Sequence, residues 1–483
     1  MSSQRPKLMT KGFRTFQAAQ NVWDTTLYFS TPVSFLKDWE STISADQAFY
    51  RATSVLQRAQ LLERICALIH SDKALIQALY IKESGLSNTR FEAEFSRLTH
   101  TLSLFAAHIQ KFAWEKESCL TQEAKTLLKK RVAIGPVLVL GSSNFPLAYS
   151  TMGGDSVAAL AAGCCVVLKA HPMHVGTSLA VASCVERALQ DLNFPAGIFS
   201  HIIDNTYHWA STFAQHPRIQ AIGFTGSIKG RRALMDLAAQ RPAPIPVFAE
   251  MGSLNPVLIL ADYPADLLAV AAEKLANSIC TDAGQFCTKP GLLLVHESHF
   301  EHFKKALLTA LEQQAAVPML HPDIYQKFEA RKRQVFQVKG MTPYQSQQSQ
   351  SGIIGRWGLA QCQISQLIEE ATLREEVFGP FAMLSSFANL AELPAILNVL
   401  GGQLTCSIFK NEELPLDVSL EQVIIENVGR IIINSVPTGV SVAEAMHHGG
   451  PYPASSDARF TAVGPDSILR FTKEVSWQKH DSQ

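Results

Sequence analysis

Short apolar runs rich in β-branched residues alternate with helical patterns from residue 136 onwards. Strands that alternate with helices form βαβ units, which place their strands in a mostly parallel sheet. The runs are Val137–Leu140, Val166–Leu168, Ala221–Phe224, Val247–Ala249, Val257–Leu260, Leu292–Val295 and Ile431–Ile433. The sequence therefore predicts an α/β protein, and sheets of this kind bind ligands beside the carboxyl ends of their strands.

The length and composition are those of a large globular protein. Its 483 residues suggest about two to four domains. Hydrophobic residues make up 47% and charged residues 17% of the chain, which suits large cores, and the formal net charge is zero. We expect neither a nucleic-acid nor a membrane partner. Residues 52–70 predict an amphipathic helix, 114–132 an exposed hairpin or a helix end, and 342–352 a mobile surface loop.

The apolar runs and the cysteines indicate a cytoplasmic protein. The longest nearly unbroken apolar run, around Val157–Leu168, is far shorter than the roughly 20 residues of a membrane-spanning helix. The N-terminus lacks the apolar segment of a secretory signal. The nine cysteines are odd in number and show neither a CxxC nor a zinc-ligand spacing. We therefore expect a reducing compartment, no disulfide framework, no metal site and mostly buried core thiols.

One cysteine differs from the others in its surroundings. Cys287 lies in TDAGQFCTKPG, between two glycines and directly before a buried strand. This segment alone is compatible with three roles for Cys287: an inert core thiol, a redox partner or a nucleophile.

Three polar residues follow other predicted strands. The Asn144 amide can donate to a developing oxyanion or satisfy a turn. The Lys169 ammonium can reach ribose or phosphate oxygens, or it can be solvated. Glu250 can act as a general base on water or cap the next turn.

Two further segments are compatible with a nucleotide. Gly226, Ser227 and Gly230 lie where a strand leads into a helix, and such a turn brings backbone N–H groups close to a phosphate. A plain tight turn explains them equally well. Glu376 and Phe378 are two residues apart and point to the same side of an extended segment. Together they suit a ribose and a flat ring, or they belong to a surface loop.

In combination and in this order, these motifs resemble the aldehyde dehydrogenase superfamily. The resemblance covers nearly the whole chain and rests on NFP at 144–146, the lysine of VVLKAHP, FTGS at 224–227, FAEMG at 248–252, GQFC at 284–287 and EEVFGP at 375–380. FAEMGSLNPV and GQFCTKPG resemble the branch that contains α-ketoglutarate semialdehyde dehydrogenases and NADP-dependent fatty aldehyde dehydrogenases.

The resemblance implies a fold of three parts. A Rossmann-like NAD(P)-binding domain takes residues 1–113 and 134–251, and an α/β catalytic domain takes 252–446. A small oligomerisation element takes 114–133 and 447–483, where a hairpin pairs with the C-terminal tail. We therefore expect a homodimer or a homotetramer.

The resemblance also implies a mechanism. Cys287 attacks the aldehyde carbon, and the Asn144 amide with the Cys287 backbone N–H holds the oxyanion. A hydride is then transferred to the nicotinamide, which leaves a thioester on Cys287. Glu250 activates the water that hydrolyses this thioester. The implied cofactor-binding residues are Lys169, Gly226, Ser227, Gly230, Glu376 and Phe378.

The cofactor is NADP or NAD, and the sequence favours NADP. Many NAD-linked relatives carry a glutamate three residues after the lysine, whereas Pro172 stands here. A 2′-phosphate is then not repelled, and Lys169 with His171 or His174 can attract it. Against this, residues 201–211 contain no arginine.

The substrate implied first is 2,5-dioxopentanoate, which would give 2-oxoglutarate. The predicted pocket residues, which form a partly apolar funnel, are Tyr149, Met152, Phe286 and Thr288. A dicarboxylic semialdehyde also needs a cation for its far carboxylate, and Arg97 or Arg459 are the candidates. A medium- or long-chain aliphatic aldehyde is the alternative substrate.

Three other classes of protein stay open. A CoA-acylating dehydrogenase would share Cys287 but would not need Glu250 as a base. A cysteine hydrolase would need His447 or His448 beside Cys287. A non-catalytic homologue would bind a cofactor without turnover.

Overall fold

The computed structural model describes residues 12–111, 114, 118–122, 125–348 and 351–480. Its contacts divide the chain into two compact units. The first takes Met1–Phe224, Ala233–Val247 and Pro465–Gln483, and the second takes Thr225–Arg232 and Phe248–Gly464. The N-terminal segment that was considered for a secretory signal, residues 1–11, lies outside the described residues.

The first unit is built on a buried five-stranded sheet of order β11-β10-β7-β8-β9. The strands are β7 (Val137–Leu140), β8 (Val166–Lys169), β9 (Phe199–Ile202), β10 (Ala221–Thr225) and β11 (Val247–Glu250). Strands β10, β7, β8 and β9 pair in parallel. The predicted parallel α/β arrangement is confirmed, and the first strand of the sheet, β7, lies at its centre.

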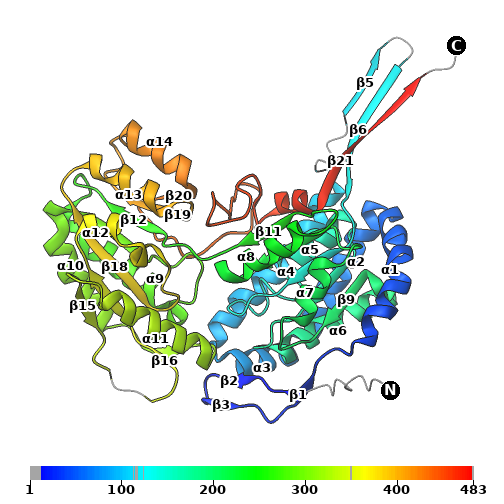
Figure 1. The fold of residues 1–483 in the computed structure, drawn as a ribbon, viewed down its shortest axis with the longest axis horizontal. Helices are drawn as coiled ribbons and strands as arrows, with labels where there is room; N and C mark the ends of the chain where they lie inside the picture. Colours follow the sequence, from blue (N-terminus) through cyan, green and yellow to red (C-terminus); the bar gives the residue numbers. More distant parts are fainter. Residues whose placement is uncertain (1–11, 112–113, 115–117, 123–124, 349–350, 481–483) are drawn as a thin grey trace, which may run out of the picture. The chain divides into compact units, whose positions relative to one another are not determined.

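Eight helices of the described chain surround this sheet or lead from it (Figure 1). They are α1 (Ser34–Ala52), α2 (Val55–Ser71), α3 (Lys73–Ser84), α4 (Asn88–Gln110), α5 (Gly154–Ala162), α6 (Val175–Asp191), α7 (His208–Gln215) and α8 (Ile228–Ala239). Helix α2 begins later than the predicted residue 52 because Ser54 and Gln57 form a capping box. Two small sheets, β1 (Gly12–Phe13) with β4 (Tyr28–Phe29) and β2 (Phe16–Gln17) with β3 (Val22–Trp23), precede them.

The polar stretch around residue 120 forms a hairpin, not a helix end. Strands β5 (Ser118–Gln122) and β6 (Lys125–Ala133) pair antiparallel, and the C-terminal strand β21 (Thr472–His480) pairs with β6 along nine residues. Figure 1 shows these cyan and red strands extending from the rest of the first unit. Lys129 and Arg131 on β6 pair with Glu474 on β21, which accounts for the charges of both signs.

The second unit is built on a seven-stranded sheet of order β15-β17-β18-β13-β12-β19-β20. The strands are β12 (Pro256–Ile259), β13 (Leu292–His296), β15 (Thr342–Gln345), β17 (Gly358–Gln361), β18 (Phe381–Phe387), β19 (Gln403–Phe409) and β20 (Val428–Ile433). All neighbours pair in parallel except β15, which is antiparallel to β17. A two-stranded sheet joins β14 (Val317–Pro318) to β16 (Ile354–Gly355).

Both faces of the seven-stranded sheet are buried. Successive residues of β12 and β13 alternate between two core clusters, so that Val257 belongs to one and Leu258 to the other. Helices α9 (Leu268–Cys280) and α10 (Glu297–Glu312) cover one face. The other is covered by α11 (Pro322–Phe336), α12 (Ile364–Glu369), α13 (Leu393–Leu400) and α14 (Val418–Asn427).

Two expectations differ from the structure. The predicted surface loop over 342–352 is wrong at its start, because Thr342–Gln345 forms the edge strand β15. An edge strand needs only one hydrogen-bonded neighbour and tolerates polar side chains. The polar composition of this segment therefore resembled that of a surface loop. The segment 447–464 groups with the second unit, although the predicted oligomerisation element included it. Among the described residues, no helix is long and apolar enough to cross a membrane.

Candidate active site

Cys287 lies on a strained turn between α9 and β13. After α9, the short helix η4 (Thr281–Gly284) contains three successive residues with positive φ: Asp282, Ala283 and Gly284. A Cβ on Gly284 would lie 2.5 Å from the backbone of Gly379, so only glycine fits this close approach. Cys287 is partly exposed, whereas seven of the other cysteines are buried and Cys119 is exposed.

Asn255 braces the nucleophile turn from the neighbouring segment. Its backbone is left-handed, with φ of 47°. Its Nδ2 donates to the carbonyls of Cys287 at 2.8 Å and Lys289 at 2.9 Å. Its Oδ1 accepts from Thr405 Oγ1 at 3.0 Å, which ties the turn to β19. The sequence did not single out Asn255, although asparagine is several-fold enriched among residues with left-handed backbone.

A histidine connects the cysteine to the predicted base. His448 Nε2 lies 3.7 Å from Cys287 Sγ and 2.9 Å from Glu250 Oε1. Glu250 and His448 are buried, with 4% and 1% of their surface exposed. The structure places His448 between Cys287 and Glu250, and the sequence suggested this histidine only for a cysteine hydrolase.

Backbone contacts hold this cluster in place. The His448 N–H donates to Thr461 Oγ1 at 2.9 Å, and Ala462 N–H donates to the His448 carbonyl at 2.8 Å. Glu250 ends β11 and pairs with Ser455 as an isolated bridge. Base and imidazole are thus carried by segments that the backbone fixes to each other.

The cluster is electrostatically coupled. Burial alone would lower the pKa of His448, but the Glu250 carboxylate and the Cys287 sulfur outweigh it and raise this pKa to about 9. A pKa this high keeps the imidazole protonated at neutral pH. An imidazolium beside the sulfur favours the nucleophilic thiolate.

Glu376 and Phe378 lie on the segment that contacts the nucleophile turn through Gly379. Phe378 is partly exposed. A Cβ on Gly252 would lie 1.6 Å from Glu376 Oε2, so the carboxylate packs directly against bare backbone. Glu376 Oε1 is buried and has no hydrogen-bond partner. A buried acceptor without a donor fits a ribose hydroxyl, so these residues suit a dinucleotide.

The other predicted cofactor residues lie at carboxyl ends of strands. Lys169 ends β8, and its ammonium donates to the carbonyl of Asp204 at 2.6 Å. Burial lowers the pKa of Lys169 to about 8, although Asp204 opposes the shift. Ser227 Oγ accepts from Gly230 N–H and caps α8, and Gly226 N–H donates to the Glu250 carbonyl. The turn therefore leads into a helix, which is compatible with a phosphate-binding turn and with a plain tight turn.

Asn144 follows β7 in the first unit and is partly exposed. Arg90 anchors its loop by donating to the Asn144 carbonyl at 3.3 Å and by stacking over the Phe145 ring at 4.3 Å. Arg90 is itself held by Glu94, which also accepts from two backbone N–H groups of the loop. The role of the Asn144 amide as an oxyanion donor stays a prediction.

The predicted substrate residues divide into two groups. Tyr149 and Phe286 are partly exposed, whereas Met152 is fully buried and Thr288 is buried. The expectation that Met152 and Thr288 line the pocket needs correction, because both side chains pack into protein rather than present a surface. Of the two candidate cations, Arg97 donates to the Tyr149 hydroxyl at 2.9 Å. Arg459 is exposed and paired with Asp457.

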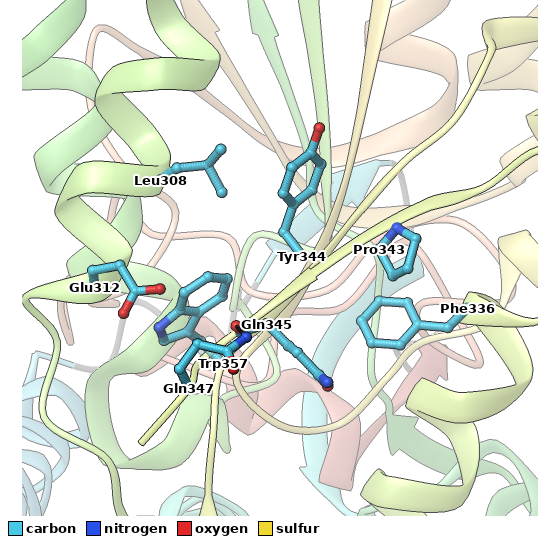
Figure 2. A pocket seen from close by; sticks show the side chains of 8 residues that line it. All are labelled: Leu308, Glu312, Phe336, Pro343, Tyr344, Gln345, Gln347 and Trp357. Carbon is cyan, nitrogen blue, oxygen red and sulfur yellow. Dashed lines mark hydrogen bonds between the residues drawn. The ribbon is translucent and has the colours of Figure 1, made fainter. Parts of the chain in front are cut away.

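A separate pocket of about 480 Å³ lies elsewhere in the second unit (Figure 2). It is lined by Leu308, Glu312, Phe336, Pro343, Tyr344, Gln345, Gln347 and Trp357. The Tyr344 hydroxyl is engaged by Gln361, and no nucleophile stands beside Glu312 among the lining residues. The pocket thus lacks the groups for catalysis. The described residues also contain no cluster that could hold a metal ion.

Comparison with known proteins assigns the class. The model of the aldehyde dehydrogenase family matches residues 33–356. This match covers more than half of the chain and shows that the chain belongs to the aldehyde dehydrogenase family and is an aldehyde oxidoreductase.

Within the family, the chain is similar to two alpha-ketoglutaric semialdehyde dehydrogenases. The protein from Acinetobacter baylyi is 37% identical over 90% of this chain and 85% of that protein. Alpha-ketoglutaric semialdehyde dehydrogenase 2 of Azospirillum brasilense is 35% identical over 89% of this chain and 84% of that protein.

Solved structures show the same fold. An NADP-dependent enzyme of E. coli aligns with a TM-score of 0.82 at 19% identity, over 97% of this chain and 95% of that one. An aldehyde dehydrogenase of Brucella melitensis biovar abortus aligns with a TM-score of 0.81 at 18% identity, over 98% of this chain and 95% of that one.

Replacing Asn255 by glycine should destabilise the nucleophile turn. Glycine tolerates the left-handed backbone but leaves the buried carbonyls of Cys287 and Lys289 without their donor. We expect a loss of about 2 kcal/mol in the free energy of unfolding, measured by urea denaturation, together with reduced turnover. Asn193→Gly is the matched control, because Asn193 has the same left-handed backbone but is exposed. Equal effects of the two variants would show that the brace contributes nothing.

Proposed function

We propose that this protein oxidises 2,5-dioxopentanoate to 2-oxoglutarate with NAD(P) through a thioester on Cys287. The observation that carries the proposal is the cluster of Cys287, His448 and Glu250, which supplies a nucleophile, a proton carrier and a base. The likeness to two alpha-ketoglutaric semialdehyde dehydrogenases at 35–37% identity supports the substrate.

The first step is the attack of Cys287 on the aldehyde carbon. A free thiol is only a few per cent ionised at neutral pH, so it needs a positively charged partner that favours the thiolate. His448 Nε2, 3.7 Å from the sulfur, is that partner. The Asn144 amide is the proposed donor to the resulting oxyanion.

Glu376, through its unpartnered Oε1, and Phe378 would hold the cofactor, and Lys169 stays a predicted contact to it. When bound, NAD(P) would supply the acceptor for the hydride of the substrate carbon, and a thioester to Cys287 would remain. The substrate carbon is thereby oxidised by two electrons.

Glu250 then activates water for hydrolysis. Its Oε1 contacts His448, while its buried Oε2 has no hydrogen-bond partner and can accept from a water molecule. Attack of this water on the thioester releases the acid and returns the thiolate. A base in this position favours hydrolysis over acyl transfer to CoA, and it argues against a non-catalytic homologue.

We further propose a preference for NADP over NAD and a homo-oligomeric assembly in the cytoplasm. Pro172 stands in place of the carboxylate that would repel a 2′-phosphate, and Lys169 supplies positive charge. The hairpin and β21 carry exposed apolar side chains, among them Leu120 and Trp477, which a second copy of the chain would cover. Arg97, bonded to Tyr149, is the proposed cation for the far carboxylate of the substrate.

Initial rates should identify substrate and cofactor. The assay crosses NADP and NAD with 2,5-dioxopentanoate, succinic semialdehyde and a medium-chain aliphatic aldehyde. We expect the highest kcat/KM for 2,5-dioxopentanoate with NADP and no dependence on added CoA. A preference for the aliphatic aldehyde would instead assign the protein to fatty aldehyde oxidation.

Glu250→Gln should separate the two halves of the reaction. Without the base, hydrolysis slows by about a hundredfold, and a burst of reduced cofactor precedes a slow steady state. The burst itself should also slow, because the variant loses the charge that keeps His448 protonated. Cys287→Ala is the control and should give no burst at all. An unchanged steady-state rate in Glu250→Gln would contradict the assignment.

His448→Gln should make Cys287 an ordinary thiol. We expect about tenfold slower alkylation of Cys287 by iodoacetamide at pH 7, because the imidazolium no longer favours the thiolate. Peptide mass spectrometry distinguishes Cys287 from the exposed Cys119. His447→Gln, one residue away, is the matched control and should react like the wild type. Equal rates for all three proteins would exclude His448 as the proton carrier.

A further inference from the structure

A buried carboxylate on helix α4 contacts the loop that follows β7. Glu94 has only 2% of its surface exposed. Its Oε2 accepts from the backbone N–H groups of Leu147 at 3.1 Å and Ala148 at 3.2 Å. Its Oε1 accepts from the Tyr80 hydroxyl at 2.7 Å and from Arg90 Nε at 3.0 Å. The loop is thus attached directly to a side chain of the helix.

Arg90 extends this attachment to the beginning of the loop. Its Nη2 donates to the Asn144 carbonyl at 3.3 Å, and its guanidinium lies over the Phe145 ring. The side chains of Arg90 and Glu94 are 9% and 3% exposed, so their ion pair is shielded from water. Neither charge is stable at this depth without the other. One carboxylate therefore holds both ends of the stretch from Asn144 to Ala148, the first end through Arg90.

The four partners of Glu94 named above are all hydrogen-bond donors, which makes the ionised carboxylate necessary. Its two oxygens only accept, so each can serve two donors. The amide of glutamine has one accepting oxygen and an NH₂ group that only donates. In Glu94→Gln this NH₂ group must face either the Arg90 side or the loop N–H groups. A donor opposite a donor forms no hydrogen bond, so the substitution keeps the size of the side chain and breaks one half of the attachment.

We infer that Glu94 is a positioning residue that fixes the Asn144 loop, and with it the amide that stabilises the oxyanion. The inference rests on the proposed function, in which the Asn144 amide is the donor to the oxyanion. Such a donor acts only when it is held where negative charge develops. The Ser142 N–H donates to the Tyr149 carbonyl at 2.9 Å and closes the base of the loop. The stretch between these two residues is held by α4.

The test is a double-mutant cycle of Glu94→Gln and Asn144→Ala, with 2,5-dioxopentanoate and NADP. Because a displacement of about 1 Å lowers a rate by roughly a hundredfold, we expect a loss of kcat of this order in Glu94→Gln. The KM for NADP should not change, since the donor acts on the reacting carbonyl. In the Asn144→Ala background the same substitution should hardly lower kcat further, because the donor that it displaces is already absent.

Asp24→Asn is the matched control. Asp24 is a buried carboxylate of the same unit that pairs with Lys82 at 2.8 Å and accepts from the Thr26 N–H at 3.1 Å. These bonds hold its own turn rather than the Asn144 loop. Urea denaturation should therefore show a loss of stability in both variants, whereas Asp24→Asn should keep the kcat of the wild type.

A folded Glu94→Gln protein with the kcat of the wild type would overturn the inference, and so would an equal loss of kcat with and without Asn144. Should Glu94→Gln not fold, Arg90→Lys decides, because lysine keeps the charge beside Glu94 but lacks the second nitrogen that reaches the Asn144 carbonyl. A loss of kcat in Arg90→Lys that is absent in the Asn144→Ala background supports the inference, and a kcat equal to that of the wild type overturns it.

The outcome for Asn144→Ala alone separates this inference from the proposed function. A kcat equal to that of the wild type in Asn144→Ala contradicts the oxyanion role and overturns the inference with it. A low kcat in Asn144→Ala together with an unimpaired Glu94→Gln overturns the inference alone, so the two failures are distinguishable.

Discussion

The contact of one imidazole nitrogen with two partners is the interaction on which the site depends. His448 Nε2 reaches both Cys287 Sγ and Glu250 Oε1, and the histidine and the carboxylate are buried. A buried imidazolium is stable only beside negative charge. The Glu250 carboxylate and the Cys287 sulfur therefore raise the pKa of His448, and removal of either one would lower it.

The backbone around the cluster is built for this approach. A Cβ on Gly284 would collide with the backbone of Gly379 and one on Gly379 with the Phe328 ring, while Asn255 has left-handed backbone of its own. Residues in such conformations are retained where surrounding structure compensates for the strain. Here the compensation comes from Asn255, which donates to the carbonyls of Cys287 and Lys289, and from Lys289, whose ammonium donates to the Phe381 carbonyl.

The strands that the sequence predicted are those with short, uniformly apolar runs, such as β7 and β13, because burial on both faces removes polar positions. The edge strand β15 was predicted as a surface loop, because its side chains are polar. The motifs of Cys287, Glu250 and Glu376 were recognisable locally. His448 was not, because it lies 161 residues from Cys287 and only tertiary folding brings the two together. Met152 looked like a pocket residue by proximity to Tyr149, yet its side chain turns inward.

The same geometry serves both halves of the proposed reaction. Before acylation the imidazolium lies beside the sulfur that attacks the aldehyde, and after acylation that sulfur belongs to the uncharged thioester. Glu250 then remains as the negative partner of His448 and, through Oε2, as the base for water. When the thioester breaks, the sulfur leaves as a thiolate and again meets the imidazolium. A protonated histidine beside the sulfur therefore assists attack and departure alike, which explains why one residue contacts both the nucleophile and the base.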